Sequence, residues 1–152
     1  MTDVPPRGPQ ERLRDTRARL ENDVDLWVAT AGASGGVHLV PLSYLWDGTA
    51  FLVSTPRTSV TGRNLLADAQ VRLGVGPTRD VVIVDGVAEP VDSADLGDKT
   101  CEAFAAKTGF DPRKETDAPY QYFRIRPRRV QAWREANELA GRTLMRDGAW
   151  LD

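Results

Sequence analysis

Short segments rich in apolar residues recur along this chain between polar turns, and they predict short β-strands. In the segment 71–75, valine and leucine alternate with arginine and glycine, which is the period of a half-buried strand. Comparable runs end at glycine, proline or Asn-Asp turns. They predict further strands at 24–31, 37–46, 50–55, 81–91, 120–126 and 128–135, and a final hairpin over 142–151.

Proline and glycine positions refine these strands. Pro41 has no backbone N–H, so its strand is expected at a sheet edge or beside a bulge. Pro127 is expected to separate two strands, and Gly86 to bend the strand 81–91. The Asp47-Gly48 pair predicts a two-residue hairpin.

Three segments have helical character: 10–22, 62–67 and 93–107. In the first, Leu13 and Leu20 lie two turns apart on one face. The third is expected to end at Gly109. Strands joined by tight turns pair antiparallel, so we expect a mainly β protein with some α structure, folded as a small antiparallel barrel.

The length of 152 residues fits one domain over 10–152. Residues 1–9, polar and rich in proline, are expected to form a flexible tail. The tail has no apolar core typical of a secretion signal, and no segment has the ~20 apolar residues of a membrane span. We therefore expect a cytoplasmic protein without a membrane partner.

The counts of reactive residues exclude several classes of site. The chain has one histidine, His38, and one cysteine, Cys101, so it cannot form a zinc site of the Cys/His type or an internal disulfide. We expect no metal site, and Cys101 is interpreted as a small core residue. A Ser–His–Asp or Cys–His mechanism would depend on His38 alone. The net charge of −2 argues against a nucleic-acid partner.

The segment 54–65 carries the most candidate chemistry. It leaves a strand and enters a helix with five hydroxyl side chains, Arg57, Arg63 and Asn64. A helix N-terminus presents free N–H groups and a positive dipole end, so hydroxyls and arginines beside it favour a phosphate site. An ordinary solvated loop with capping residues has the same composition, and the sequence leaves both interpretations open.

The order of three further segments resembles a known family. The segments are 36–48 (GVHLVPLSYLWDG), 51–55 (FLVST) and 62–65 (GRNL), the last followed by Val71-Arg72-Leu73 and later by 80–91 (DVVIVDGVAEPV). Over residues 24 to 135, this order is similar to the pyridoxamine 5′-phosphate oxidase-like superfamily of split-barrel flavin- and deazaflavin-dependent oxidoreductases. The resemblance implies a split β-barrel that is antiparallel and binds FMN.

The resemblance also implies cofactor-binding positions. The second strand would lie along the ring system through backbone groups, and the third strand with its following loop would hold the phosphate. A tryptophan and a later arginine would meet the cofactor of a partner subunit. The candidate cofactor-binding residues include these positions, and His38 and Arg57 are added to them. The full set is His38, Val40, Pro41, Leu42, Ser43, Ser54, Thr55, Arg57, Thr61, Gly62, Arg63, Asn64, Trp133 and Arg142.

Two positions depart from the oxidase pattern. His38 stands where oxidases have an arginine, and Thr61 stands where many members have a lysine. A phosphate would therefore depend on Arg57, Arg63 and hydroxyls. The departures, together with a short C-terminal region, count against a true pyridoxamine 5′-phosphate oxidase.

The resemblance implies an oxidoreductase that uses FMN, or alternatively the deazaflavin coenzyme F-420, to transfer hydride to or from a small organic substrate. Such chemistry belongs to the cofactor and needs no protein nucleophile, so we expect no catalytic side chain. A non-catalytic flavin- or haem-type binding module remains an alternative, as does pyridoxamine 5′-phosphate oxidase. The resemblance further implies a homodimer with the cofactor at the subunit interface.

Overall fold

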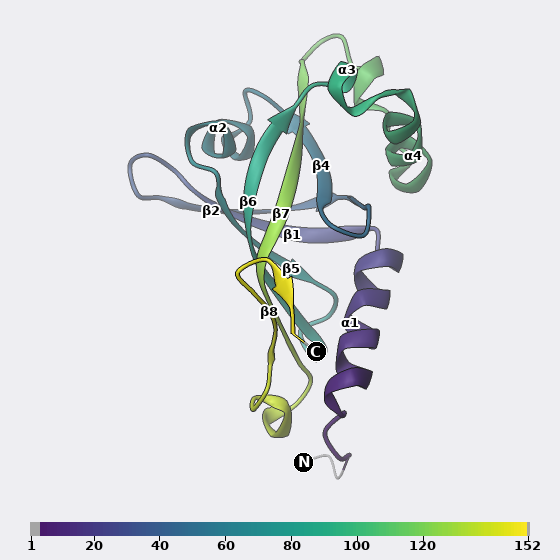
Figure 1. Ribbon diagram of the computed structural model, residues 1–152. Coiled ribbons are helices and arrows are strands. Elements are labelled where there is room, and N and C mark those ends of the chain that lie inside the picture. The colour runs from purple at the N-terminus through teal and green to yellow at the C-terminus, as the bar shows by residue number, and fades with distance from the viewer. Residues whose placement is uncertain (1–3, 152) are drawn as a thin grey trace.

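A computed structural model describes residues 4–151 and is built around one curled antiparallel sheet (Figure 1). The strands are β1 (Asp25–Ala31), β2 (Val37–Ser43), β3 (Leu45–Trp46), β4 (Phe51–Pro56), β5 (Gln70–Val75), β6 (Val81–Val91), β7 (Tyr120–Trp133), β8 (Thr143–Arg146) and β9 (Ala149–Trp150). Their order is β2-β1-β5-β6-β7-β4-β3, with β8 on β7 and β9 on β8. The mainly β, split-barrel prediction is confirmed.

Short helices lie around the sheet. They are α1 (Pro9–Asn22), α2 (Val60–Ala67), α3 (Ser93–Leu96) and α4 (Asp98–Thr108), with 3-10 turns η1 (Pro112–Lys114) and η2 (Ala136–Glu138). Leu20 of α1 is fully buried in the main core, and Leu13 packs against it. Cys101 and Phe104 of α4 form a second core with Leu52 and Tyr122 on the outer face of β4 and β7, which confirms Cys101 as a core residue. None of the described helices is both long and apolar enough to cross a membrane.

Four of the predicted elements were wrong in detail, and the fourth, at Pro127, is described below. The helix over 93–107 is two helices, because Gly97 between them has a φ of 86°, outside the helical region. The strand over 37–46 is divided at Tyr44, whose hydroxyl donates to Leu20 O at 2.9 Å. The Asp47-Gly48 hairpin has a longer loop, because the Asp47 carboxylate accepts from the N–H groups of Thr49 and Ala50.

Pro127 does not separate two strands, and β7 continues through it. Pro127 lies opposite Gly86, where the register between β6 and β7 shifts, and this irregularity accommodates the missing N–H. A Cβ at Gly86 would lie 2.8 Å from Ile125 Cγ2, so glycine permits the close approach of the strands. The predicted edge position of Pro41 on β2 is confirmed, and Gly86, where a bend was predicted, lies at the register shift of β6.

Candidate functional site

The start of α2 is built by hydroxyl groups. Ser59 caps the helix: its Oγ accepts from Gly62 N at 3.0 Å and lies 2.7 Å from Pro56 O, to which it donates. Thr55 Oγ1 lies 3.1 Å from the same Ser59 Oγ. The predicted Thr55 therefore belongs to this helix start. Ser59, which was not among the predicted binding residues, joins it, and a serine three residues before a helical glycine is a signal that could have identified this cap.

Gly62 allows the helix to begin tightly against the preceding loop. A Cβ at this position would lie 2.3 Å from Pro56 O and 3.0 Å from Arg57 O, and both of these atoms belong to the backbone. Thr61 beside it is buried, whereas Arg63 on the next position is exposed. Packing within the chain therefore requires a glycine here, because only a residue without a Cβ lets the loop and the helix of the candidate site lie this close together.

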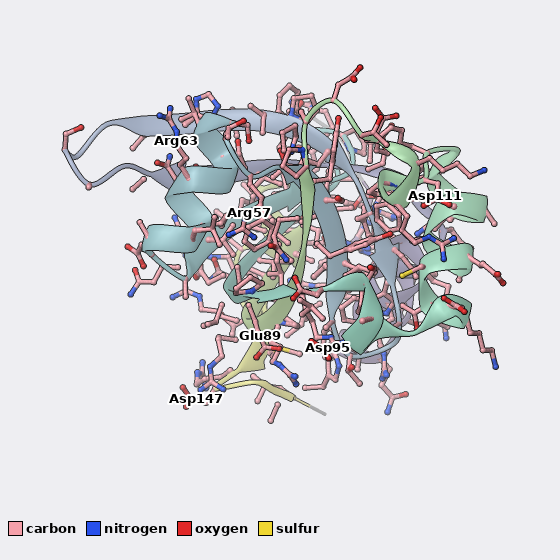
Figure 2. All side chains as sticks on the ribbon, turned by 90° about the horizontal axis from the view of Figure 1, so that it is seen from above. Arg57, Arg63, Glu89, Asp95, Asp111 and Asp147 are labelled. Carbon is pink, nitrogen blue, oxygen red and sulfur yellow. The ribbon has the colours of Figure 1, made fainter. Side chains whose placement is uncertain are left out.

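Arg57 and Arg63 are the two cations of this region. Arg57 N donates to Pro119 O at 3.0 Å, and Arg57 Nη1 donates to the Oε1 of Gln121. Among residues 4–151, no carboxylate lies within ion-pair distance of either guanidinium. Figure 2 shows both arginines on the α2 side of the molecule, far from Asp111 on the α4 side. The region therefore has two uncompensated positive charges.

Asn64 joins α2 to the β1–β2 hairpin. Its Nδ2 donates to Thr30 Oγ1 at 3.0 Å, and Thr30 lies directly opposite His38 in the strand register. The structure thus brings His38 and Asn64 to the same end of the barrel. Thr30 was missed, because only the strand pairing places it beside this helix.

The remaining β2 positions divide between two faces. Val40 and Leu42 pack against the main core. Pro41 and Ser43 lie on the opposite face, where Ser43 Oγ donates to Asp25 Oδ1 at 2.6 Å. Within the described chain β2 pairs only with β1, so its other edge leaves backbone groups available to a ligand.

Ser54 lies apart from the other phosphate candidates. Strand alternation puts it on the opposite face of β4 from Thr55, across from Tyr122 on the face that α4 covers. Its Oγ is buried and has no hydrogen-bond partner among the described residues. The sequence predicted the strand correctly, but the grouping of Ser54 with Thr55 ignored this alternation.

A cavity opens where β1 and β5 separate. The pairing of β1 with β5 ends at Ala29 and Arg72, although both strands continue. A cavity of about 410 Å³ occupies the gap and is lined by Thr30, Val37, Gln70 and neighbouring residues. Thr30, which accepts from Asn64, is the residue that this cavity shares with the polar groups beside α2.

Trp133 and Arg142 are not brought to α2 within one chain. The Arg142 guanidinium carbon lies 6.0 Å from the Trp133 ring centroid, and Arg142 Nη1 donates to Leu139 O. Trp133 lies opposite Val81 on the outer face of the sheet. The two residues form a pair of their own, away from the hydroxyl-rich loop.

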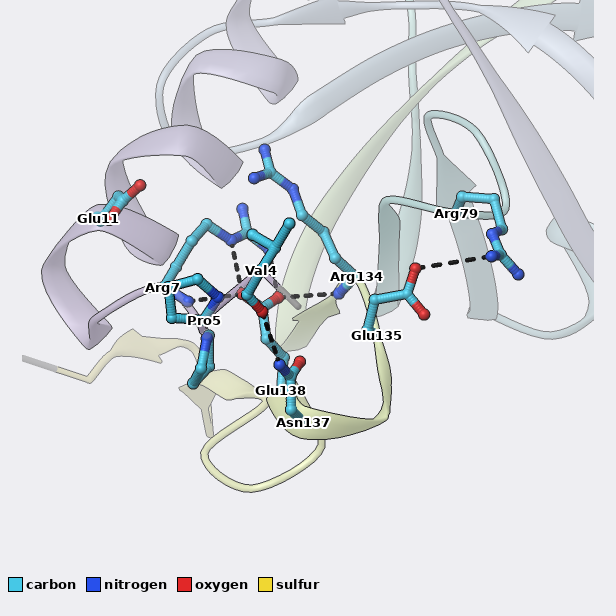
Figure 3. A pocket seen from close by; sticks show the side chains of 10 residues that line it. Val4, Pro5, Arg7, Glu11, Arg79, Arg134, Glu135, Asn137 and Glu138 are labelled. Carbon is cyan, nitrogen blue, oxygen red and sulfur yellow. Dashed lines mark hydrogen bonds and ion pairs between the residues drawn. The ribbon is translucent and has the colours of Figure 1, made fainter. Parts of the chain in front are cut away.

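The N-terminal segment is held by a buried ion pair that the sequence did not predict. Glu138, 1% exposed, accepts from Arg7 N, Nε and Nη2 and from Arg134 N at 2.8–3.0 Å. Hydrogen bonds from Arg7 lower the pKa of Glu138 to about 2. Beside the pair is a cavity of about 450 Å³ (Figure 3). Residues 1–3 of the predicted tail lie outside the described part of the chain.

Residues 14–134 match the family described as pyridoxamine 5′-phosphate oxidase. No significant match was found among curated proteins.

Solved structures with a similar fold are named after several different cofactors. A heme-binding protein from Mycobacterium smegmatis is 18% identical, with a TM-score of 0.69 over 95% of this chain and 60% of that one. An FAD-binding protein from Mesorhizobium loti is 18% identical, with a TM-score of 0.63 over 77% and 88%. An F-420 reductase is 19% identical, with a TM-score of 0.61 over 75% and 94%. At these identities, the likeness concerns the fold alone.

Proposed function

Since the chain belongs to the pyridoxamine 5′-phosphate oxidase family, we propose that it is an oxidoreductase that binds FMN, or alternatively the deazaflavin coenzyme F-420, and transfers hydride to or from a small organic substrate. The observation that carries the proposal is the start of α2. There, Arg57 and Arg63 have no carboxylate partner among residues 4–151, and they lie beside a capped helix N-terminus. Such a group fits a phosphate.

Different residues of the site would bind different parts of the cofactor. Arg57, Arg63 and the N–H groups of Val60 and Thr61 would hold the phosphate, since the next N–H of α2, that of Gly62, already donates to Ser59 Oγ. Asn64, which donates to Thr30, and His38, which lies opposite Thr30 in the strand register, would border the same ligand at the end of β2. The free edge of β2 over Val40–Ser43 would orient the ring through backbone groups, and its N–H groups would stabilise negative charge there.

The chemistry itself does not require a protein nucleophile. A bound flavin or deazaflavin supplies the hydride transfer. The chain contributes position and electrostatics, and the cavity of about 410 Å³ at the split of the sheet would admit a small substrate beside the ring. This division of labour is consistent with a chain that has a single histidine and a single cysteine.

We also propose a homodimer that completes the cofactor site. The outer face of β1 and β2 exposes 51% of Trp27, 60% of Leu39 and 89% of Val37, an apolar face that a second copy would cover. Trp133 lies on the same outer face of the sheet. Trp27 pairs with Gly74, and Gly74 pairs with Ile83 on β6. Val81, which pairs with Trp133, is two residues from Ile83, so their side chains share a face. In such a dimer, Trp133 and Arg142 of one copy would lie near the cofactor site of the other copy.

The absorption spectrum of the purified protein, followed by titration with FMN and with F-420, tests the proposal. Flavin bands, or saturable binding of FMN, support the first choice of cofactor, and binding of F-420 alone supports the alternative. A Soret band with no affinity for either cofactor would refute the proposal and indicate a haem-type binding module. A bound cofactor that no acceptor reoxidises favours a non-catalytic module, and oxidation of pyridoxamine 5′-phosphate would identify the oxidase activity.

A further inference from the structure

Arg57 is fixed at two points by the beginning of β7. Its backbone N–H donates to Pro119 O at 3.0 Å, and its Nη1 donates to Gln121 Oε1. Gln121 lies opposite Thr55 in the β4–β7 register, next to the cap of α2. The side chain of Arg57 is therefore held by a residue that follows it by 64 positions in the sequence.

The orientation of the Gln121 amide is determined by its other contacts. Gln121 is 4% exposed, and its Nε2 donates to Val91 O at 2.9 Å, to Tyr122 O at 3.1 Å and, more weakly, to Asp92 Oδ1 at 3.5 Å. A carbonyl oxygen accepts only from the NH₂ side of an amide, so Oε1 must face the guanidinium of Arg57. The side chain thus connects the end of β6 to the loop that precedes α2.

A neutral amide has a particular consequence for the charge of Arg57. A carboxylate at this position would orient the guanidinium and neutralise it, whereas an amide oxygen orients it and leaves the positive charge in place. Within residues 4–151 the guanidinium has no ion-pair partner. The arrangement therefore holds a cation in a fixed position with its charge available to an anion.

We propose that Gln121 is a positioning residue that holds Arg57 toward the phosphate of the bound cofactor. The inference rests on the proposed function, because the anion it serves is the phosphate of FMN or F-420. A pre-oriented guanidinium loses less side-chain freedom on binding than a free one, so the benefit appears as affinity for the phosphorylated ligand.

Affinities for FMN and for riboflavin, which lacks the phosphate, test this role in Gln121→Leu. We expect a ~10-fold loss of FMN affinity, the size of a charge-assisted hydrogen bond, with riboflavin affinity unchanged. Gln121→Glu should also lose its preference for FMN, because the carboxylate would neutralise Arg57. A general structural defect would weaken both ligands equally, and that result would overturn the proposal.

The Arg57→Ala background provides the matched control. Once Arg57 is removed, Gln121→Leu should no longer change the ratio of FMN to riboflavin affinity, whereas an unchanged effect in this background would contradict the proposal. If Gln121→Leu does not fold, Gln121→Met provides the same loss of the acceptor.

The wild-type protein separates the two possible failures. A wild-type protein that prefers FMN, with variants that keep the same preference, would refute the positioning role and leave the proposed function standing. If the wild-type protein does not bind FMN, the comparison uses F-420 and its phosphate-free deazaflavin. Failure to bind either phosphorylated cofactor would refute the proposed function and the positioning role together.

Discussion

Substitution of Glu138 by glutamine should destabilise the folded protein strongly at neutral pH. Glu138 is 1% exposed and accepts two side-chain hydrogen bonds from Arg7, which is itself 8% exposed. The pKa of Glu138 falls from an ordinary 4.5 to about 2 on folding. A tenfold change in a protonation constant corresponds to about 1.4 kcal/mol, so the charged carboxylate contributes roughly 3 kcal/mol of folding free energy at pH 7.

The pH dependence follows from the lowered pKa. The stabilisation is fully present above the unfolded pKa of 4.5, and it is lost as the pH falls toward about 2, where the folded carboxyl also takes up a proton. Urea unfolding of the wild-type protein and of Glu138→Gln, each at pH 7 and pH 3, gives the difference directly. We expect about 3 kcal/mol at pH 7 and a much smaller difference at pH 3.

Glu135→Gln is the matched control in the same loop. Glu135 pairs with Arg79 at 3.6 Å, but the Arg79 side chain is 83% exposed, so the substitution should change stability by less than ~0.5 kcal/mol. If Glu138→Gln loses less than ~1 kcal/mol at pH 7, or if its loss is the same at pH 3, the buried ion pair does not stabilise the fold as argued.

Three other outcomes are expected. Arg63→Ala should weaken cofactor binding by ~1.5–3 kcal/mol in a calorimetric titration, and unchanged affinity would remove Arg63 from the site. Gly62→Ala should cost ~1–3 kcal/mol in thermal unfolding, because its Cβ would meet Pro56 O at 2.3 Å. In the control Gly36→Ala, the Cβ would meet no atom within 4 Å, and a melting temperature equal to that of Gly62→Ala would contradict the packing argument. Leu39→Glu, on the apolar face, should give a monomer in sedimentation velocity, whereas Ala106→Glu, at an exposed position of α4, should remain a dimer. A dimer in both variants would place the interface elsewhere.

Local sequence was sufficient to predict most elements of the fold. Alternation predicted β5, a continuous apolar run predicted β6, and the glycine after α4 predicted its end, because each of these signals acts within a few residues. The errors arose where a distant partner changed a local preference. Pro127 remains inside β7 because the register shift opposite it, at Gly86, removes the need for its missing N–H.

The candidate site was predicted in its composition and only partly in its arrangement. The loop before α2 carries the predicted arginines and hydroxyls, and Thr55 contacts its cap. The position of Ser54 on the opposite face could have been found from strand alternation, whereas the contact of Asn64 with Thr30 depends on the packing of α2 against β1.

The sequence by itself determined which chemistry is possible here. One histidine and one cysteine exclude zinc sites of the Cys/His type within the chain, and the order of its segments resembles a flavin-binding family. Tertiary structure alone decided which charges are neutralised. Glu138 neutralises Arg7 across 131 positions, while Gln121 orients Arg57 without removing its charge. The physical reason is that an ion pair forms only when folding brings its partners together, and the strength of that pair depends on a burial that composition does not record.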